Sequence, residues 1–347
     1  MLKNDLHDRG IAVFGAGGHT GRFVVDELER RGLRAIRIGR DLQKIAAVGE
    51  PSKSEPARVA RVDDQASLDA ALAGAAALIN CAGPFVDTAI PLIDAALRAG
   101  IPYFAVAAEQ AVVQSVFDTR DEAARAAGVS VVPAAAFYGG LADLLASAVA
   151  GDAENIDEIS VVVGLDSWHP TGGTRLTGQR NTAPRVVQRN GRLEPVPATP
   201  ATGQWDFPEP IGTRQIIMLP LSEIITLTSH LKVDTVTSWM NVEPLQDLRD
   251  PATPPPQPSD ELGRSPQRFV MDVVVKLGAQ RRRARATGRD IYQVSAPIIV
   301  ETVERLLAGS NQPEAGVYSL GAMFDAKDFL SALGNGTIEV SYADVPA

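Results

Sequence analysis

The segment "VFGAGGHTGR", residues 13–22, contains four glycines within ten residues and joins two regions of different character. The apolar run at 10–16 is typical of a buried strand, and the pattern over 20–31 predicts an amphipathic helix. A turn with so few side chains lets the backbone approach another group closely. The segment therefore predicts a strand–turn–helix unit whose turn faces a ligand.

The glycine spacing fits a turn that holds a dinucleotide. Thr20 stands where a strict G-x-G-x-x-G pattern needs its last glycine, but Gly15, Gly18 and Gly21 fit G-x-x-G-x-x-G. In such a turn the first glycine makes the bend, the middle ones admit a pyrophosphate, and the last lets the helix pack on the strand. The free amides at the helix N-terminus attract phosphates. The residues expected to bind them are Gly15, Gly17, Gly18, His19, Thr20 and Gly21.

The first 135 residues repeat this strand–helix pattern. Further apolar runs of strand length lie at 34–39, 57–63, 76–83, 101–107 and 129–134. Parallel neighbours need crossover connections, and helices must then cover both faces of the sheet. We therefore predict an α/β fold with a Rossmann domain, a doubly wound parallel sheet, over 1–135.

The pattern changes after about residue 156. Longer runs with few helices between them predict a second sheet, with strands at 157–168, 214–222, 230–242, 268–279 and 280–288. The proline-rich segment 252–267 predicts a stiff surface loop, with a lid over a site as the alternative. We place a second domain, for substrate binding and dimerisation, at 136–310, and a C-terminal segment at 311–347.

The end of the predicted second strand indicates which coenzyme binds. An acidic residue there would bind the ribose 2′-hydroxyl of NAD, whereas an arginine would bind the 2′-phosphate of NADP. Arg40 follows the strand directly, and a guanidinium suits a phosphate. Asp41 keeps NAD as the alternative, but its position favours capping of the next helix. We therefore expect NADP, as NADPH, to be the cofactor.

Two more predicted strand ends face the same crevice. Asp63 closes the third strand, where adenine would lie; the alternative is a helix cap, a role that Asp64 also fits. The small residues after the fourth strand would border the nicotinamide ribose, and they are Cys81, Ala82, Gly83 and Pro84. We expect Cys81 to be a packed small residue, because no histidine lies near it in sequence to activate a thiolate.

Several motifs together resemble the saccharopine dehydrogenase-like NADP-binding family. They are "GAGGHTGR", "GRDLQKI", "NCAGPF", "IDAALRAGIPYFAVAAEQ" and "GGLADLLA", within about 10–150, with a later likeness over 288–333. This family includes saccharopine reductases and trans-acting enoyl reductases. The resemblance implies a Rossmann domain, a second α+β domain on a mainly antiparallel sheet, and a C-terminal segment that returns to the first domain. Glu109 matches an acidic position of the family, but Ala105 and Ala107 depart from its polar pattern.

Hydride transfer needs a positioned proton source beside the coenzyme. The segment "DSWHPTGGTR" at 166–175 combines His169, a general acid, with Arg175, a cation for a substrate anion. The alternative for this segment is a plain hairpin turn. Tyr138 would face the nicotinamide, or else be a buried tyrosine with a satisfied hydroxyl. No metal-ligand spacing occurs, so we expect no metal.

Composition limits the partners. The 347 residues carry a net charge of -9, so no nucleic-acid partner is expected. No uncharged apolar stretch reaches the length of about 18 residues that a membrane span needs. Cys81 is the only cysteine, and the charged N-terminus lacks the apolar core of a secretion signal. Both features favour a cytoplasmic protein.

These patterns predict an NADP-dependent oxidoreductase that reduces a C=N or C=C bond of a small metabolite. The alternative is a sensor that binds NADP without turnover. A deep, polar cleft at Gly83 and Pro84 would favour the enzyme, and a plugged cleft would favour the sensor. A homodimer formed through the second domain is a further expectation.

Overall fold

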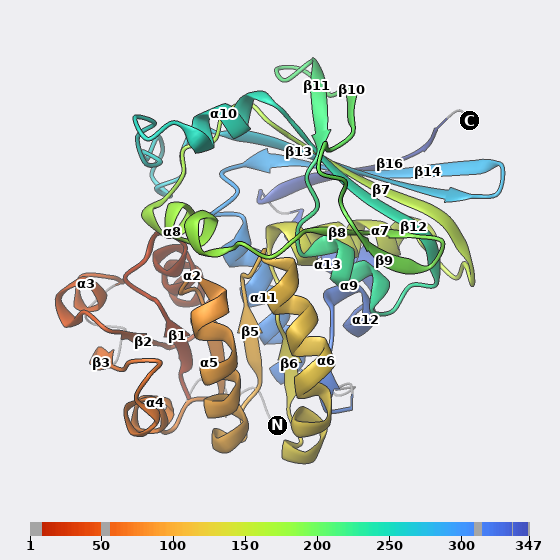
Figure 1. The fold of residues 1–347 in the computed structure, drawn as a ribbon. Coiled ribbons are helices and arrows are strands. Elements are labelled where there is room, and N and C mark those ends of the chain that lie inside the picture. The colour runs from red at the N-terminus through yellow and green to blue at the C-terminus, as the bar shows by residue number, and fades with distance from the viewer. Residues whose placement is uncertain (1–8, 50–55, 309–313, 335, 346–347) are drawn as a thin grey trace.

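The computed structural model describes residues 9–49, 56–308, 314–334 and 336–345, and it contains two sheets, one above the other (Figure 1). The described strands of the first sheet are all parallel, in the order β15–β6–β5–β4–β1–β2–β3. Their bounds are β1 Ile11–Phe14, β2 Ala35–Gly39, β3 Arg58–Val59, β4 Ala77–Asn80, β5 Tyr103–Ala105, β6 Ser130–Val132 and β15 Gly316–Val317. The order of β1 to β6 is that of a Rossmann sheet, which confirms the predicted fold class.

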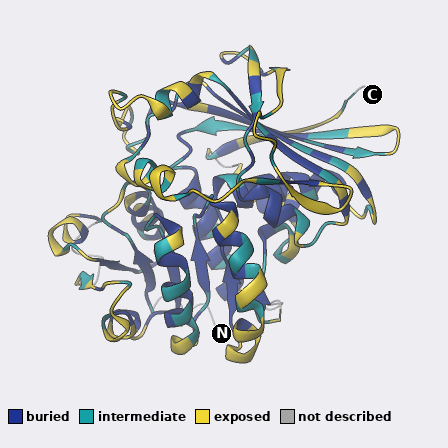
Figure 2. Cartoon of the chain, viewed as in Figure 1, coloured by how far each residue is buried: buried dark blue, intermediate teal, exposed yellow. Residues whose placement is uncertain are grey.

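Helices cover both faces of this sheet because its strands are apolar on both faces. In β1, Ile11 and Val13 contribute to one core cluster, whereas Ala12 and Phe14 contribute to the other. The covering helices are α2 His19–Arg30 and α11 Ser295–Ala308 on one face, and α4 Gln65–Leu72, α5 Phe85–Ala99 and α6 Gln110–Ala127 on the other. Figure 2 shows the strands buried between them.

The second sheet is mixed and mainly antiparallel, as expected. Its main path is β10–β11–β12–β7–β13–β14–β16, with β8 and β9 attached at β12. The bounds are β7 Ile156–Leu165, β8 Val186–Arg189, β9 Arg192–Pro195, β10 Thr202–Asp206, β11 Thr213–Met218, β12 Val233–Asn241, β13 Arg268–Leu277, β14 Gln280–Arg289 and β16 Ile338–Val345. Only the pairing of β12 with β7 is parallel among the described strands.

The two sheets share one hydrophobic core. Side chains of α2, α11 and β1 belong to the same buried cluster as Val161 and Met271 of the second sheet. Helices α7, α9 and α13 lie under the second sheet (Figure 1). The remaining helices have these bounds: α3 Leu42–Ala46, the π-helical turn η1 Phe137–Leu141, α7 Ala142–Ala150, α8 Gly172–Arg180, α9 Glu223–Thr228, α10 Glu243–Arg249, α12 Leu320–Met323 and α13 Ala326–Leu333.

The C-terminal segment contributes to both sheets. Strand β15 extends the first sheet by pairing with β6, which is the return that the resemblance implies. Strand β16 instead pairs with β14 of the second sheet along its length. The limits of 1–135, 136–310 and 311–347 for the three parts of the chain stay a proposal.

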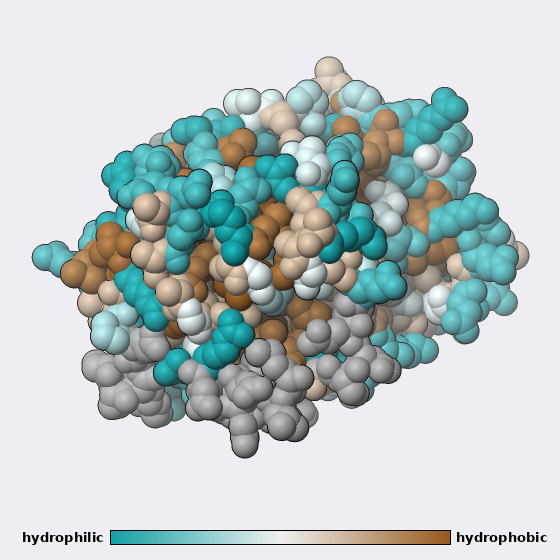
Figure 3. All heavy atoms as spheres, turned by 90° about the horizontal axis from the view of Figure 1, so that it is seen from below, coloured by the Kyte–Doolittle hydropathy of each residue, from teal (hydrophilic) through white to brown (hydrophobic). Residues whose placement is uncertain are grey.

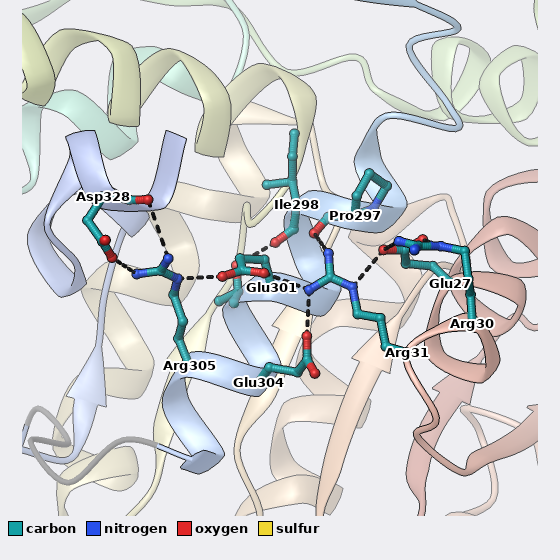
Figure 4. Close-up of polar contacts among 10 residues, drawn as sticks. Glu27, Arg30, Arg31, Pro297, Ile298, Glu301, Glu304, Arg305 and Asp328 are labelled. Carbon is teal, nitrogen blue, oxygen red and sulfur yellow. Dashed lines mark hydrogen bonds and ion pairs between the residues drawn. The ribbon is translucent and has the colours of Figure 1, made fainter. Parts of the chain in front are cut away.

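Charged side chains fasten α2 to α11 (Figure 4). Arg31, at the C-terminal end of α2, donates to Glu27 of its own helix and to Glu301 and Glu304 of α11. Glu301 also accepts from Arg305, which connects the group onward to α13. The helix that begins at the glycine turn is therefore anchored at its other end.

The underside of the first domain is remote from the second sheet. Seen from below, it mixes hydrophilic and hydrophobic side chains (Figure 3). Within the described ranges, no helix is both long enough and apolar enough to span a bilayer.

Candidate functional site

The glycine turn lies between the C-terminal ends of β1 and β4. Gly15 has φ +85°, and an added Cβ would lie 2.9 Å from the backbone nitrogen of Ala82. At Gly21 an added Cβ would lie 2.1 Å from the carbonyl oxygen of Gly15. These two glycines therefore let the turn fold tightly and let α2 pack on it, as the sequence predicts.

The N-terminus of α2 is free of side-chain caps. Its N-cap, Gly18, supplies no side-chain hydrogen bond, and the first turn contains no acidic residue. The two short helices nearby differ, because Asp41 caps α3 and Asp64 caps α4 with their carboxylates. Of these three helices, α2 is therefore the one whose N-terminal amides have no side-chain cap and remain available to an anion.

The 2′-phosphate candidate, Arg40, follows β2 and is exposed. Asp41 accepts hydrogen bonds from the amides of Gln43 and Lys44, which confirms its expected capping role. The missing side chain at Gly39 makes room for α3, since an added Cβ would lie 2.8 Å from Cγ2 of Ile45.

The expectation that Asp63 closes the third strand is wrong. Strand β3 ends at Val59, and Asp63 lies in the exposed turn before α4, 2.7 Å from Arg61. Within 57–63, only Arg58 and Val59 pair with β2. A contact of Asp63 with adenine stays a prediction.

A buried hydrogen-bond network fixes the turn after β4. Asn80 donates to the hydroxyls of Thr88 and Tyr103 and accepts from the amide of Ala82. Burial raises the pKa of the Cys81 thiol to about 12, so the thiol stays protonated. This agrees with a packed small residue rather than a nucleophile. Residues 81–84 thus follow the C-terminal end of β4, with Ala82 against the glycine turn, and their contact with a ribose stays a prediction.

Glu109 is 3% exposed and faces the same region. Its two carboxyl oxygens accept from the amides of Phe85 and Ala108, each at 3.1 Å. The Glu109 carboxyl group therefore accepts from the first amide of α5, as a capping side chain would. The matched acidic position therefore has a structural role here.

The end of the candidate segment at 166–175 is helical rather than a hairpin turn. Residues 172–180 form α8, which lies over α2 and α5 between the two domains (Figure 1). An added Cβ at Gly83 would lie 2.9 Å from Oγ1 of Thr177, and Arg180 pairs with Asp87 of α5 at 2.6 Å. Helix α8 therefore packs on the turn after β4 and on α5.

His169 and Arg175 both contact the loop after α10. Nδ1 of His169 lies 3.2 Å from the carbonyl oxygen of Pro254. Arg175 donates to the carbonyl oxygens of Asp250 and Thr253 at 3.0 and 2.8 Å. These side chains hold the proline-rich segment near α8, and no contact joins them to Tyr138. Their catalytic roles stay predictions.

An aromatic cluster joins the glycine turn to the second domain. The His19 ring packs edge-on against Phe23 and Tyr292, with centroids 5.2 and 5.4 Å apart. The Tyr292 hydroxyl accepts from Nε1 of Trp168 and lies 3.0 Å from Oγ1 of Thr174. Tyr292 was not predicted from the sequence, because "GRDIYQV" has no recognisable site pattern.

Tyr138 lies in η1, and its hydroxyl is buried with no hydrogen-bond partner among the described residues. Near it lies Glu223 at the start of α9, which is 1% exposed. Burial raises the pKa of both groups above their ordinary values. Glu223 was not predicted either, although an acidic residue directly before the largely apolar run "IITLT" is a recognisable signal.

The family comparison that rests on sequence concerns the first domain. Residues 11–132 match the model of the saccharopine dehydrogenase NADP binding domain. The predicted resemblance is confirmed. Saccharopine dehydrogenase-like oxidoreductases of Bos taurus and Mus musculus are each 28% identical over 152 residues, 39% of this chain and 35% of theirs. The matched part of the chain thus spans about a third of the length of these relatives.

One solved structure is similar over nearly the whole chain. It is apo histidine-tagged saccharopine dehydrogenase (L-Glu forming) from Saccharomyces cerevisiae, with a TM-score of 0.63 and 12% identity. The likeness covers 97% of this chain and 100% of that chain. At this identity it establishes the shared fold alone.

Proposed function

We propose that this chain is an NADP-dependent oxidoreductase that reduces a C=N or C=C bond of a small metabolite. The observation that carries the proposal is the uncapped N-terminus of α2 behind a turn in which Gly15 and Gly21 leave no room for side chains. The match of residues 11–132 to an NADP-binding domain supports the same conclusion.

The residues around the crevice fit a dinucleotide. The turn from Gly15 to Gly21 would hold the pyrophosphate, and Arg40 would hold the 2′-phosphate. Residues 81–84 would border the nicotinamide ribose, and Asp63 remains the proposed adenine contact. Bound NADPH would supply the hydride, whereas the protein positions the substrate and supplies the proton.

Tyr138 and His169 are the two proposed proton donors. The Tyr138 phenol follows the last Rossmann strand by a few residues, and its raised pKa keeps the proton on the oxygen. Arg175 would hold an anionic group of the substrate and His169 would supply the proton in the alternative, provided that the loop they hold moves when substrate binds.

The sensor alternative has one observation in its favour. Helix α8 packs on Gly83, where an added Cβ would lie 2.9 Å from Oγ1 of Thr177. This arrangement is closer to a plugged cleft than to a deep one. For the enzyme, α8 must therefore move away from Gly83 before the coenzyme and substrate can enter.

A turnover assay separates the enzyme from the sensor. NADPH absorbance is followed with a panel of small cyclic imines and enones, and with NADH in its place. The enzyme predicts NADPH oxidation that depends on at least one compound. Saturable NADPH binding without oxidation across the panel would favour the sensor.

A cytoplasmic location and a homodimer through the second sheet also remain proposals. Sedimentation equilibrium across a tenfold range of protein concentration tests the second. A monomer mass throughout would contradict it.

A further inference from the structure

Helix α8 has no apolar anchor in the protein. None of its nine residues is buried, and its large apolar side chain, Leu176, is 41% exposed. Three of the nine residues are glycines, which lower the stability of a helix. An element with few buried apolar contacts opens at a lower free energy than the core does. Helix α8 can therefore leave its position without exposing a hydrophobic core.

Two polar contacts hold α8 in place. Arg180, in its last turn, pairs with Asp87 in the first turn of α5 at 2.6 Å. Near the start of α8, Oγ1 of Thr174 lies 3.0 Å from the hydroxyl oxygen of Tyr292. These two contacts form a latch, one at each end of the helix.

The chain on either side of α8 is anchored. Before the helix, Trp168 is 6% exposed and its amide donates to Asp247 at 3.0 Å. After the helix, the backbone of Val186 forms two hydrogen bonds of 2.8 Å with the side chain of Gln110. Arg175 fastens the loop after α10 to α8, so the loop moves with the helix. The segment between Trp168 and Val186 is therefore a unit that can swing between two fixed points.

The latch holds α8 at the place where a doubly wound sheet binds its ligand. The order of the strands reverses between β1 and β4, and ligands bind outside the carboxyl ends of the strands at such a point. The two turns meet there, since an added Cβ at Gly15 would lie 2.9 Å from the amide nitrogen of Ala82. An added Cβ at Gly83 would lie 2.9 Å from Oγ1 of Thr177. Thr177 thus lies directly against the second of these turns.

We propose that α8 is an autoinhibitory lid. While the latch holds, Thr177 takes the place of the nicotinamide half of the coenzyme beside Gly83, and the adenosine half can still bind. This inference rests on the proposed function. The measured affinity for NADPH is then the intrinsic affinity reduced by the fraction of molecules whose lid is open. Weakening the latch therefore tightens the binding of NADPH.

The ion pair of the latch gives a test in which charge alone predicts opposite signs. By charge alone, Arg180→Gln would weaken the binding of anionic NADPH and Asp87→Asn would strengthen it. The lid predicts that each variant binds NADPH about threefold tighter. The double variant should gain no more than either single variant, because all three lose the same pair. Effects of opposite sign in the two single variants would overturn the inference.

Arg98→Gln is the matched control for the ion pair. It breaks the pair of Arg98 with Asp69, which has the same exposed character but lies away from α8. Its affinity for NADPH should equal that of wild type, as measured by fluorescence titration. A gain as large as that of Arg180→Gln would contradict the latch.

Adenosine 2′,5′-bisphosphate separates a lid from a change of the whole site. This probe lacks the nicotinamide half, so its Kd should be equal in wild type and in the latch variants. Tyr292→Phe keeps the ring beside His19 and removes the hydroxyl that contacts Thr174. It should bind NADPH about three- to tenfold tighter and the bisphosphate unchanged. An equal gain for both compounds would overturn the inference.

Hydrogen exchange measures the latch without any ligand. The amides of α8 should exchange faster in Arg180→Gln and in Tyr292→Phe than in wild type, because each variant loses one contact of the latch. The amides of α11, which is largely buried, should exchange at the wild-type rate in both variants. Unchanged exchange of α8 in both variants would overturn the inference.

A disulfide tests the closed lid directly. Since an added Cβ at Gly83 lies 2.9 Å from Oγ1 of Thr177, β-carbons at these two positions are no more than about 4.3 Å apart, within the range for a disulfide. The native Cys81 does not compete, because burial raises the pKa of its thiol to about 12. The Gly83→Cys, Thr177→Cys protein oxidised with diamide should bind NADPH at least tenfold more weakly than after reduction with dithiothreitol. Equal affinity in the two forms would overturn the inference.

Failure of the lid and failure of the proposed function give different results. If wild type binds NADPH and no latch variant binds it more tightly, the proposed function stands and the lid is wrong. If wild type and every latch variant bind neither NADPH nor the bisphosphate, the proposed function fails and the lid fails with it.

Discussion

Gly21 shows at the scale of one residue why the turn needs glycine. An added Cβ would lie 2.1 Å from the carbonyl oxygen of Gly15, which is backbone and cannot move aside cheaply. The same close approach brings α2 onto the strand and directs its free amides toward the crevice. Stability and the proposed coenzyme binding therefore depend on the same atoms.

Gly21→Ala should lower the free energy of unfolding by about 3 kcal/mol, because the methyl group overpacks the turn. Gly178→Ala is the control, since Gly178 lies in α8 and has no atom within 4 Å of an added Cβ. It should gain up to about 1 kcal/mol from the higher helix propensity of alanine. Urea unfolding measures both, and a Gly21→Ala protein as stable as wild type would contradict the geometry.

Arg40 is the residue proposed to select NADPH over NADH. Arg40→Gln should weaken NADPH about 10- to 100-fold, the equivalent of a charge-assisted hydrogen bond, and leave NADH nearly unchanged. Arg98→Gln, which removes an arginine paired with Asp69, should change neither affinity. Fluorescence titration of both coenzymes gives the ratio, and equal losses for NADPH and NADH would remove the 2′-phosphate contact.

At the scale of elements, α2 and α11 are joined by ion pairs that differ in burial. The Arg31 side chain is 18% exposed and contacts three carboxylates, whereas Arg30 is 61% exposed and pairs, among the described residues, with Glu27 alone. Removing Arg31 would leave Glu301 and Glu304 close together without the cation between them (Figure 4).

Arg31→Gln should therefore lower the free energy of unfolding by about 2–4 kcal/mol, and Arg30→Gln by less than about 1 kcal/mol. Chemical denaturation at low and high salt measures the difference between these neighbours. If both variants lose the same small amount, the contacts between α2 and α11 do not stabilise the arrangement of the site.

A second polar contact joins α7 to the turn after α9. Nε2 of His230 lies 2.6 Å from Oδ1 of the fully buried Asp143, whose Oδ2 accepts from the amide of Gly321. Burial lowers the pKa of His230, but attraction to Asp143 outweighs it, and the pKa is raised above the ordinary value. The folded state therefore binds this proton more tightly than the unfolded chain does.

The stability from His230 should be fully present below about pH 6.5 and lost as pH rises through the raised pKa. His230→Gln should remove this part of the pH dependence, which unfolding titrations from pH 5 to 9 would show. His169→Gln, whose ring faces a carbonyl rather than a carboxylate, should keep it. An identical pH dependence in wild type and His230→Gln would contradict the assignment.

For the whole molecule, the first sheet was predictable because its strands are buried on both faces. Short apolar runs separated by helical patterns leave few arrangements other than a parallel sheet, and the observed order follows. The capping residues Asp41 and Asp64 were also recognisable, since capping is a local interaction. The tight glycine turn was predictable for the same reason.

Features that depend on distant contacts could not be predicted. Helix α8 contains three glycines and no buried residue, and its contacts with Gly83 and Asp87 come from another part of the chain. The short β3 depends on how far β2 extends beside it. Glu223 and Tyr292 become neighbours of Tyr138 only when the two domains pack together.

The central claim is that the glycine turn and the uncapped end of α2 bind the phosphates of NADP. Calorimetric titration of the intact protein with NADPH, NADH and 2′-phosphate-free analogues tests it most directly. The account predicts saturable one-site binding of NADPH at least tenfold tighter than NADH, reduced strongly in Gly21→Ala protein that remains folded. No heat and no thermal stabilisation with either coenzyme would contradict it.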